Sequence, residues 1–208
     1  MGTTHAVRRK YNLIAKIYDW IYAGYLSKTI RSACQALALR GDEKILDIGC
    51  GTGELEKALI QKNPALSITG VDISTDMLEI ARKKFLNAAN VTFQEGDFLK
   101  IALPDETFDA AFSLSNLHYF PNPQAILQKT NRHLKKGGKL IIVDWNRGTF
   151  KGKFYNFYMR LADPSFIKIY TRDEIATLLE KSGFIVEKVD YFGVGIAWAM
   201  MCVVARKG

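Results

Sequence analysis

The chain has 208 residues, of which 48% are hydrophobic and 24% are charged, as in ordinary globular domains. This composition excludes a disordered, collagen-like or highly charged chain, and the length suits one domain with its own core. The formal net charge of +8 is uneven, because residues 45–131 carry a net −4 between two basic ends, net +5 before them and net +7 after them. Such a balance fits an anionic membrane surface, an acidic small molecule, a nucleic acid or solubility alone.

The three cysteines, Cys34, Cys50 and Cys202, form no C-x-x-C pair, so neither a disulfide framework nor a metal site is predicted. A reducing, cytoplasmic location is the expectation. The basic N-terminus lacks the apolar stretch of a signal peptide. The charge-free apolar stretch at residues 191–205 is shorter than the ~20 residues that a membrane span needs, so a buried strand is the better interpretation.

The first 40 residues predict two amphipathic helices, at 11–23 and 27–39, from apolar residues at helical spacing. Strands and helices then alternate along the chain. Strands are predicted at 44–48, 67–71, 91–94, 108–114, 139–145, 184–191 and 199–206. Helices are predicted at 54–61, 75–86, 123–134 and 171–181.

This alternation predicts an α/β fold with a Rossmann-like, seven-stranded and mostly parallel sheet that is covered by helices on both faces. The last two strands are joined by only about seven residues, 192–198, which are too few for a crossover helix. The last strand is therefore expected to run antiparallel to its neighbour.

The strongest signal is the segment Ile-Leu-Asp-Ile-Gly-Cys-Gly-Thr-Gly-Glu at 45–54, between the first strand and the next helix. Its glycines let the backbone turn sharply and approach a ligand closely. Asp72 ends the second strand, where a carboxylate can bind both hydroxyls of a ribose. A nicotinamide site would need a third glycine at the position of Glu54, whose carboxylate would repel a pyrophosphate. The spacing favours an adenosyl ligand with no phosphate and a cationic amino-acid tail.

The segment at 45–54 resembles motif I of the class I S-adenosylmethionine-dependent methyltransferases. Val-Asp-Ile-Ser at 71–74 resembles their acidic second-strand motif, and Gly-Asp-Phe at 96–98 resembles the motif after the third strand. The segments at 112–119 and 134–138 resemble the motifs around the fourth strand and before the fifth. The match covers residues 40–145, and it implies that the chain is a methyltransferase with S-adenosylmethionine as its cofactor.

The resemblance also implies roles in binding the adenosine half of the cofactor. Asp72 would bind the ribose hydroxyls, with Ile73 and Met77 against the adenine. Asp97 would accept a hydrogen bond from the adenine amino group, and Phe98 would donate one through its backbone.

Further residues would contact the methionine half. The loop glycines that would line it are Gly49, Gly51 and Gly53. Asp47 would hold the amino group of the methionine, directly or through water, and Ser113 or Leu114 would contact the cofactor near its methyl group.

The sequence disfavours some acceptors. It has no [ND]-P-P-[FYW] motif after the fourth strand, which amino-adenine and glutamine-amide methylation would need. No cysteine lies where RNA cytosine methylation would place its nucleophile, and the thiol set of arsenite methylation is missing.

The segment at 11–19 resembles the A-x-x-Y-D helix that covers the cofactor in quinone C-methyltransferases, soluble bacterial phosphatidylethanolamine N-methyltransferases and phosphoethanolamine methyltransferases. By that resemblance, residues 1–40 form lid helices and residues 41–208 form the methyltransferase domain.

Three residues are candidates for catalytic contact with the acceptor. Tyr11 and Tyr18, seven residues apart, share one face of the first helix, although plain amphipathic packing gives the same pattern. His118 follows the fourth strand, where ligands of parallel sheets bind. It could serve as a general base, as an orienting donor or as a locally bonded turn residue. The insert at 146–170 interleaves aromatic and basic residues, which suits the cover of an acceptor pocket or an ordinary helix with a solvated basic face.

The sequence thus predicts a cytoplasmic methyltransferase that can contact an anionic membrane surface peripherally. Its expected acceptor is small or lipid-like, such as a phospholipid amine or a quinone. The alternatives are a soluble metabolite as acceptor, an RNA methyltransferase, or a non-catalytic protein that keeps the cofactor fold. The acidic middle of the chain is the part that would bind the cofactor with its cationic tail. The excess of basic residues therefore belongs to the N-terminal helices and to the segments after the fifth strand, which are expected to surround the acceptor. It therefore favours an anionic or membrane-borne partner over a nucleic acid.

Overall fold

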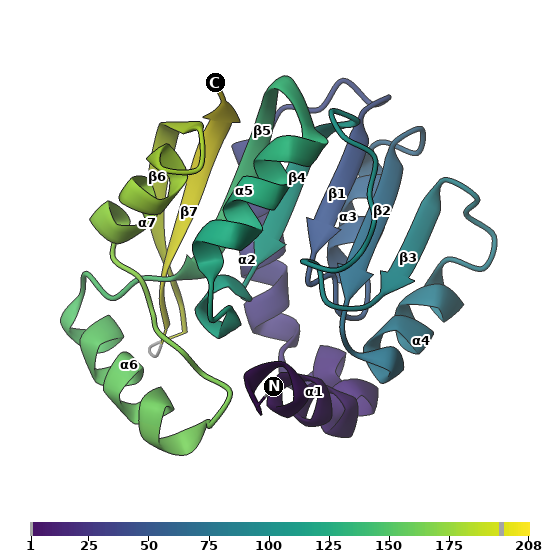
Figure 1. Cartoon of the computed structure of the whole chain (residues 1–208). Helices are drawn as coiled ribbons and strands as arrows, with labels where there is room; N and C mark the ends of the chain where they lie inside the picture. The colour runs from purple at the N-terminus through teal and green to yellow at the C-terminus, as the bar shows by residue number, and fades with distance from the viewer. Residues whose placement is uncertain (1, 196–197) are drawn as a thin grey trace.

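A sheet of seven strands occupies the centre of the molecule (Figure 1), and the computed structural model describes residues 2–195 and 198–208. The strand order is β3-β2-β1-β4-β5-β7-β6. The strands are β1 (Lys44–Ile48), β2 (Ser67–Asp72), β3 (Val91–Glu95), β4 (Phe108–Leu114), β5 (Leu134–Trp145), β6 (Phe184–Val194) and β7 (Trp198–Lys207). Strands β1 to β5 pair in parallel, whereas β7 runs antiparallel to both β5 and β6. The predicted Rossmann-like sheet with an antiparallel last strand is confirmed.

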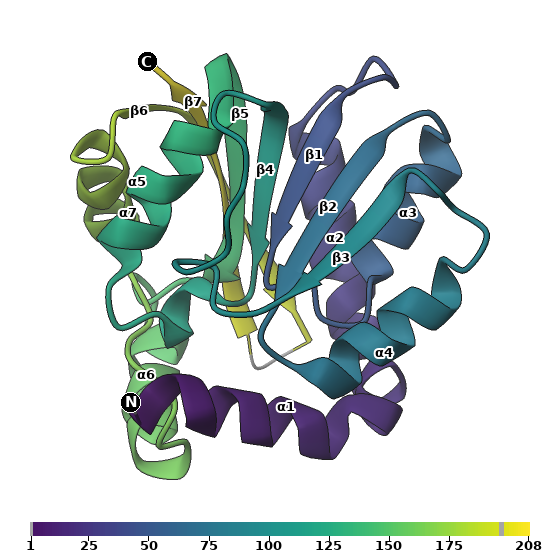
Figure 2. The same cartoon turned by 45° about the vertical axis from the view of Figure 1, so that its right-hand side comes forward.

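The helices lie on both faces of the sheet and at one of its ends (Figures 1 and 2). They are α1 (Gly2–Ile21), α2 (Ala23–Ala36), α3 (Glu54–Lys62), α4 (Thr75–Lys84), α5 (Pro123–His133), α6 (Phe150–Ala162) and α7 (Arg172–Glu180), with a short 3-10 helix, η1 (Leu117–Tyr119). Within the described residues, no helix is both long enough and apolar enough to cross a membrane.

Each face of the sheet has its own apolar core, because successive side chains of a strand point to opposite faces. Leu46 and Ile48 of β1 lie in the core that α5 and α7 cover, whereas Ile45 lies in the core that α2 and α3 cover. Strands buried on both faces read as continuous apolar runs, which is how the sequence marked them. The carboxyl ends of the parallel strands remain as the edge where polar loops gather.

Helix α1 lies across that edge rather than on a face of the sheet (Figure 2). It begins at Gly2, well before the predicted start at residue 11, because Ala6, Arg8 and Lys10 are strong helix formers that carry no apolar period of their own. Helix α2 likewise begins at Ala23, earlier than its predicted start at 27.

Two other boundaries differ from the prediction. Helix α5 ends at His133 and β5 begins directly at Leu134, so the two glycines at 137–138 lie inside the strand instead of in a separate turn. The pairing of β5 with β4 shifts register there, between Phe108 and Ala110. Strands β6 and β7 are longer than predicted, which reduces their link to residues 195–197, and 196–197 lie outside the described residues.

Candidate functional site

The glycine-rich loop follows the last residue of β1 and leads into α3. All three of its glycines have left-handed backbone angles, with φ of 75° at Gly49, 54° at Gly51 and 82° at Gly53. A side chain at Gly49 would collide with the Asn116 amide, which donates to the carbonyl of Ile48. Only glycine therefore permits this path of the loop at the end of the strand.

Asp72, the last residue of β2, faces the loop across the end of the sheet. Its Oδ2 accepts from the backbone N–H of Gly51 at 2.8 Å, and its Oδ1 accepts from the backbone N–H of Ser74 at 2.8 Å. Burial raises the pKa of Asp72, and the N–H donors of Ser74 and Gly51 oppose that rise. Each oxygen keeps lone-pair capacity for a further donor, such as a ligand hydroxyl.

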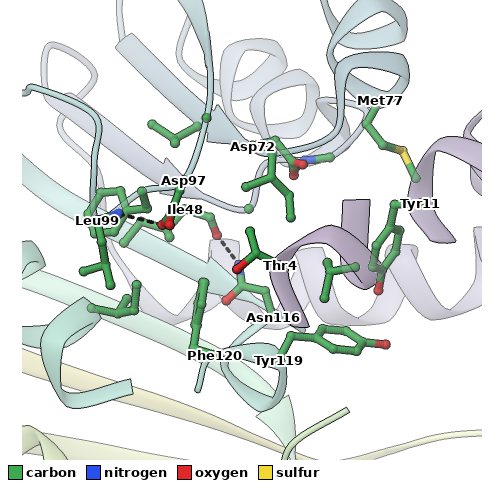
Figure 3. Close-up of a pocket in the computed structure, with 18 of the residues that line it drawn as sticks. Thr4, Tyr11, Ile48, Asp72, Met77, Asp97, Leu99, Asn116, Tyr119 and Phe120 are labelled. Atoms are coloured by element: carbon green, nitrogen blue, oxygen red, sulfur yellow. Dashed lines mark hydrogen bonds between the residues drawn. The ribbon is translucent and has the colours of Figure 1, made fainter. Parts of the chain in front are cut away.

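A cavity of about 250 Å³ lies between the loop, Asp72 and α1 (Figure 3). Its walls include the apolar side chains of Ile48, Met77 and Phe120, and its polar groups include the carboxylates of Asp72 and Asp97. Among the described residues that line this cofactor cavity there is no lysine, arginine or histidine. The lining therefore fits a ligand with hydroxyls, a flat ring and a positive charge, and it has no cation for a phosphate.

Most of the predicted cofactor residues line the cofactor cavity. Those that do are Gly49, Gly51, Asp72, Ile73, Met77, Asp97, Phe98 and Leu114. The Asp97 side chain also accepts from the backbone N–H of Leu99 at 3.0 Å, so it caps its own turn while it faces the cavity.

Three predicted cofactor residues lie behind the lining instead. Gly53 precedes the first residue of α3 and fixes the turn into that helix. Ser113 is buried, and its hydroxyl donates to the Asn116 side chain. Asp47 is buried within β1 and does not line the cavity.

Asp47 forms a buried acidic pair with Glu56 of α3. Glu56 is fully buried, and neither of its carboxylate oxygens nor Asp47 Oδ1 has a hydrogen-bond partner among the described residues. Burial raises the pKa of Glu56 to about 7, and burial together with the neighbouring Glu56 raises the pKa of Asp47. The two buried carboxyls therefore keep their protons to a higher pH than exposed carboxyls do.

A second, larger cavity of about 780 Å³ lies on the other side of α1, between that helix and α6. Nine tyrosine and tryptophan side chains form part of its walls: Tyr11, Tyr18, Tyr22, Tyr25, Tyr119, Trp145, Tyr155, Tyr158 and Trp198. Four residues line both cavities: Tyr11, Tyr18, Ser115 and Tyr119. The Tyr11 ring lies 5.9 Å from the rings of both Tyr18 and Tyr119, centroid to centroid. The predicted pair of tyrosines thus stands at the junction of the two cavities.

His118 lines the second cavity, and a carboxylate fixes its orientation. Its Nδ1 lies 2.6 Å from Asp144 Oδ1, and its ring stacks on Trp145 with centroids 4.5 Å apart. Asp144 Oδ1 also accepts from the backbone N–H of Trp145 at 2.7 Å. Because a carboxylate only accepts, Nδ1 carries the proton of the neutral ring and Nε2 keeps a free lone pair. This is the arrangement of a general base held by an acid partner.

Helix α1 is fastened over both cavities by polar contacts. Lys10 donates to Asp163 at 2.5 Å and to the hydroxyl of Tyr119 at 2.8 Å. Further along the helix, Ser74 donates to the side chain of Asn12 at 2.6 Å. The helix is thus tied to the loops on either side of the site.

Four residues of the site were not predicted from the sequence. Ser115, Asn116 and Tyr119 follow β4 in the segment that carried the family resemblance, but their roles depend on contacts with distant elements. Asp144 lies near the end of β5, and a carboxylate in such a place was the signal that marked Asp72. The same signal could have identified it.

Residues 45–138 match the protein family described as "Methyltransferase domain". A demethylmenaquinone methyltransferase of Tropheryma whipplei is 31% identical over 206 residues, covering 87% of this chain and 84% of the relative. A protein of the same name from Thermotoga maritima is 29% identical, covering 86% of this chain and 84% of the relative.

Solved structures share the fold. A Thermotoga maritima protein described as a SAM-dependent methyltransferase, possible histamine N-methyltransferase, has a TM-score of 0.78 at 23% identity, over 99% of this chain and 100% of that one. The [4+2]-cyclase SpnF has a TM-score of 0.79 at 19% identity, over 100% of this chain and 97% of that one. The same fold therefore accompanies differently described reactions, so the acceptor has to be argued from the site.

Proposed function

The chain belongs to the class I S-adenosylmethionine-dependent methyltransferase family, and from this premise we propose that it methylates a ring carbon of a reduced quinone-type lipid. The observation that carries the proposal is the common wall of the two cavities. Among the described residues, a cofactor cavity with acidic groups and no lysine, arginine or histidine adjoins a large aromatic cavity, and Tyr11, Tyr18, Ser115 and Tyr119 line both. The demethylmenaquinone methyltransferases among its relatives support the choice of acceptor.

In this proposal the cofactor lies in the smaller cavity. Asp72 accepts from the ribose hydroxyls, and Ile73 and Met77 enclose the adenine, while Asp97 and Phe98 bind its polar edge. The loop glycines would face the methionine part: Gly49, Gly51 and Gly53. Asp47, which is buried behind the loop, would act on the methionine amino group through water, and Ser113 would act through Asn116. Leu114 would contact the cofactor near its methyl group.

S-adenosylmethionine, when bound, supplies an electrophilic methyl group. His118 Nε2 takes the proton from a hydroquinone hydroxyl, and Asp144 stabilises the imidazolium that results. With the cofactor bound, a new bond would form between the electron-rich ring carbon and the methyl carbon as the methyl–sulfur bond breaks, and the electron pair of that bond would remain on sulfur. The ring carbon would then lose its proton to water, which restores aromaticity, and His118 Nε2 would return its proton to the ring oxygen, so one proton is released overall.

Tyr11 and Tyr18 serve as hydrogen-bond donors in this scheme, not as bases. Burial raises the pKa of both phenols well above the usual value, so both hydroxyls keep their protons at neutral pH. At the junction of the cavities they can donate to an acceptor oxygen while the reacting carbon faces the cofactor.

The proposal includes where the protein works. An acceptor of this class is borne by a membrane, so we place the protein in the cytoplasm, in peripheral contact with an anionic membrane surface. Of the two N-terminal helices within 1–40, α1 acts as the lid over the domain at 41–208, since its Tyr11 and Tyr18 line both cavities, whereas α2 covers one face of the sheet. A nucleic acid is not part of the proposal.

The test is methyl transfer from labelled S-adenosylmethionine to a short-chain naphthohydroquinone, with the product identified by mass spectrometry. We expect a C-methylated product from the reduced acceptor and none from the oxidised quinone, whose ring is electron-poor. An O-methylated product, or transfer only to phosphatidylethanolamine, would overturn the quinone carbon as acceptor. Isothermal titration with S-adenosylmethionine, run beside it, separates lost cofactor binding from a wrong acceptor.

A further inference from the structure

Helices α1 and α6 both carry large apolar side chains that face the solvent, and we propose that these two helices form a face that docks on an anionic lipid bilayer. This inference rests on the proposed function only in that the second cavity receives a lipid acceptor. The docking face consists of Leu13, Ile17, Trp20 and Ile21 of α1 and Phe150, Phe154, Phe157, Tyr158 and Leu161 of α6.

The spacing of these residues is the same in both helices. Each set begins with positions i, i+4, i+7 and i+8, and α6 adds i+11, so each set forms one stripe along its helix. The residues are far from buried: Trp20 is 83% exposed and Phe150 is 87% exposed. An amphipathic helix normally buries its apolar stripe, so two exposed stripes mark a surface that meets something apolar.

The two stripes meet at the mouth of the aromatic cavity. Leu13 of the α1 stripe and Tyr158 of the α6 stripe both line that cavity while they remain 76% and 52% exposed. The ion pair between Lys10 and Asp163 holds the two helices together beside this mouth. Both helices lie at the same end of the molecule (Figures 1 and 2). A ligand that leaves the docking face can therefore enter the second cavity directly between them.

The charges on these helices select a bilayer as the partner. Exposed basic residues beside the stripes are Arg9, Lys16, Lys151, Lys153 and Arg160. None of these five has a carboxylate partner among the described residues, and α6 contains no acidic residue. Apolar and aromatic side chains flanked by unpaired cations match a headgroup region of anionic lipids above acyl chains.

Vesicle co-sedimentation tests the docking face on the whole protein. We expect binding to vesicles of phosphatidylglycerol and phosphatidylcholine to be at least tenfold tighter than binding to phosphatidylcholine alone. The triple variant W20Q/F154Q/F157Q should lose at least tenfold in affinity for the anionic vesicles. The variant L86Q/I185Q, which changes two exposed apolar residues outside α1 and α6, should bind like the wild type. Equal loss in both variants, or indifference to lipid charge, would overturn the proposal.

Two further measurements keep this test separate from that of the proposed function. The W20Q/F154Q/F157Q variant should methylate a short-chain, water-soluble acceptor at the wild-type rate if the face serves only docking. If the wild type binds vesicles but methylates no quinol, the docking face is supported and the proposed function is contradicted. A wild type that dimerises in light scattering without binding vesicles, and that the triple variant makes monomeric, assigns the face to a second copy of the chain and overturns the bilayer.

Discussion

Asp72 joins the glycine loop to the end of β2, and its carboxylate carries the predicted grip on the ribose. In the variant D72N one acceptor oxygen becomes an NH₂ group, which opposes the N–H of Gly51 or of Ser74. We expect the Kd for S-adenosylmethionine to rise about tenfold to a hundredfold, as for the loss of hydrogen bonds to a charged group of about 1.5–3 kcal/mol. Isothermal titration measures it, with D76N on the exposed side of α4 as the control. Equal affinities in the two variants would contradict the ribose role.

The pairing of His118 with Asp144 predicts a loss of rate without a loss of cofactor binding. H118Q should lower kcat by about 10²- to 10⁴-fold, the usual contribution of a general base. D144N should lower kcat less, because it leaves the base in place without its orienting carboxylate. A kcat within threefold of the wild type would remove His118 from the mechanism.

The buried acidic pair of Asp47 and Glu56 predicts a pH-dependent stability. Burial raises the pKa of Glu56 from the usual 4.5 to about 7 in the folded protein. The free energy of unfolding therefore falls as the pH rises from about 4.5 to about 7, because the unfolded chain releases this proton first. We expect E56Q to remove a fall on the order of 2 kcal/mol, measured by urea unfolding at pH 5 and pH 7.5. The exposed Glu79 supplies the control, E79Q, and an unchanged slope in E56Q would refute the assignment.

At the scale of the element, α1 packs most extensively on α4, and polar side chains also tie it to the loops beside the site. The variant K10M removes the cation that binds Asp163 and Tyr119, a half-buried contact that we expect to contribute about 1 kcal/mol. Amide hydrogen exchange in α1 should become about threefold to tenfold faster, while exchange in β1 and β4 stays the same. K16M, in the same helix, removes a lysine with no ion pair among the described residues and should change little.

The elements also show what periodicity can and cannot predict. Strands that are buried on both faces read as apolar runs, and the helix predicted at 171–181 forms as α7, behind a capping box of Thr171 and Glu174. The first nine residues of α1 escaped because polar helix formers leave no apolar period. The start of β5 at Leu134 was not predicted, because the two glycines lie inside the strand. They fit there because the pairing of β5 with β4 shifts register, and that pairing cannot be read from the local sequence.

At the scale of the whole molecule, the cofactor half was predictable and the acceptor half was not. The glycine loop and Asp72 are local patterns, so the sequence located them directly. The second cavity is assembled from α1, α2, η1, β5, α6 and β7, and residues that meet there lie far apart in the chain, as do Tyr25 and Trp145. No spacing rule joins residues 120 positions apart, and for the same reason the contacts of Ser115 with Tyr25 and of Tyr119 with Lys10 appeared only in the structure.

One helix closes both cavities, and this has a thermodynamic consequence. Tyr11 and Tyr18 of α1 are walls of the cofactor cavity and of the acceptor cavity at once, so the two ligands share one closed position of the helix. A ligand that stabilises this position of α1 therefore also favours the binding of the other ligand. The two binding equilibria are then linked, and the factor by which the cofactor tightens acceptor binding must equal the factor by which the acceptor tightens cofactor binding.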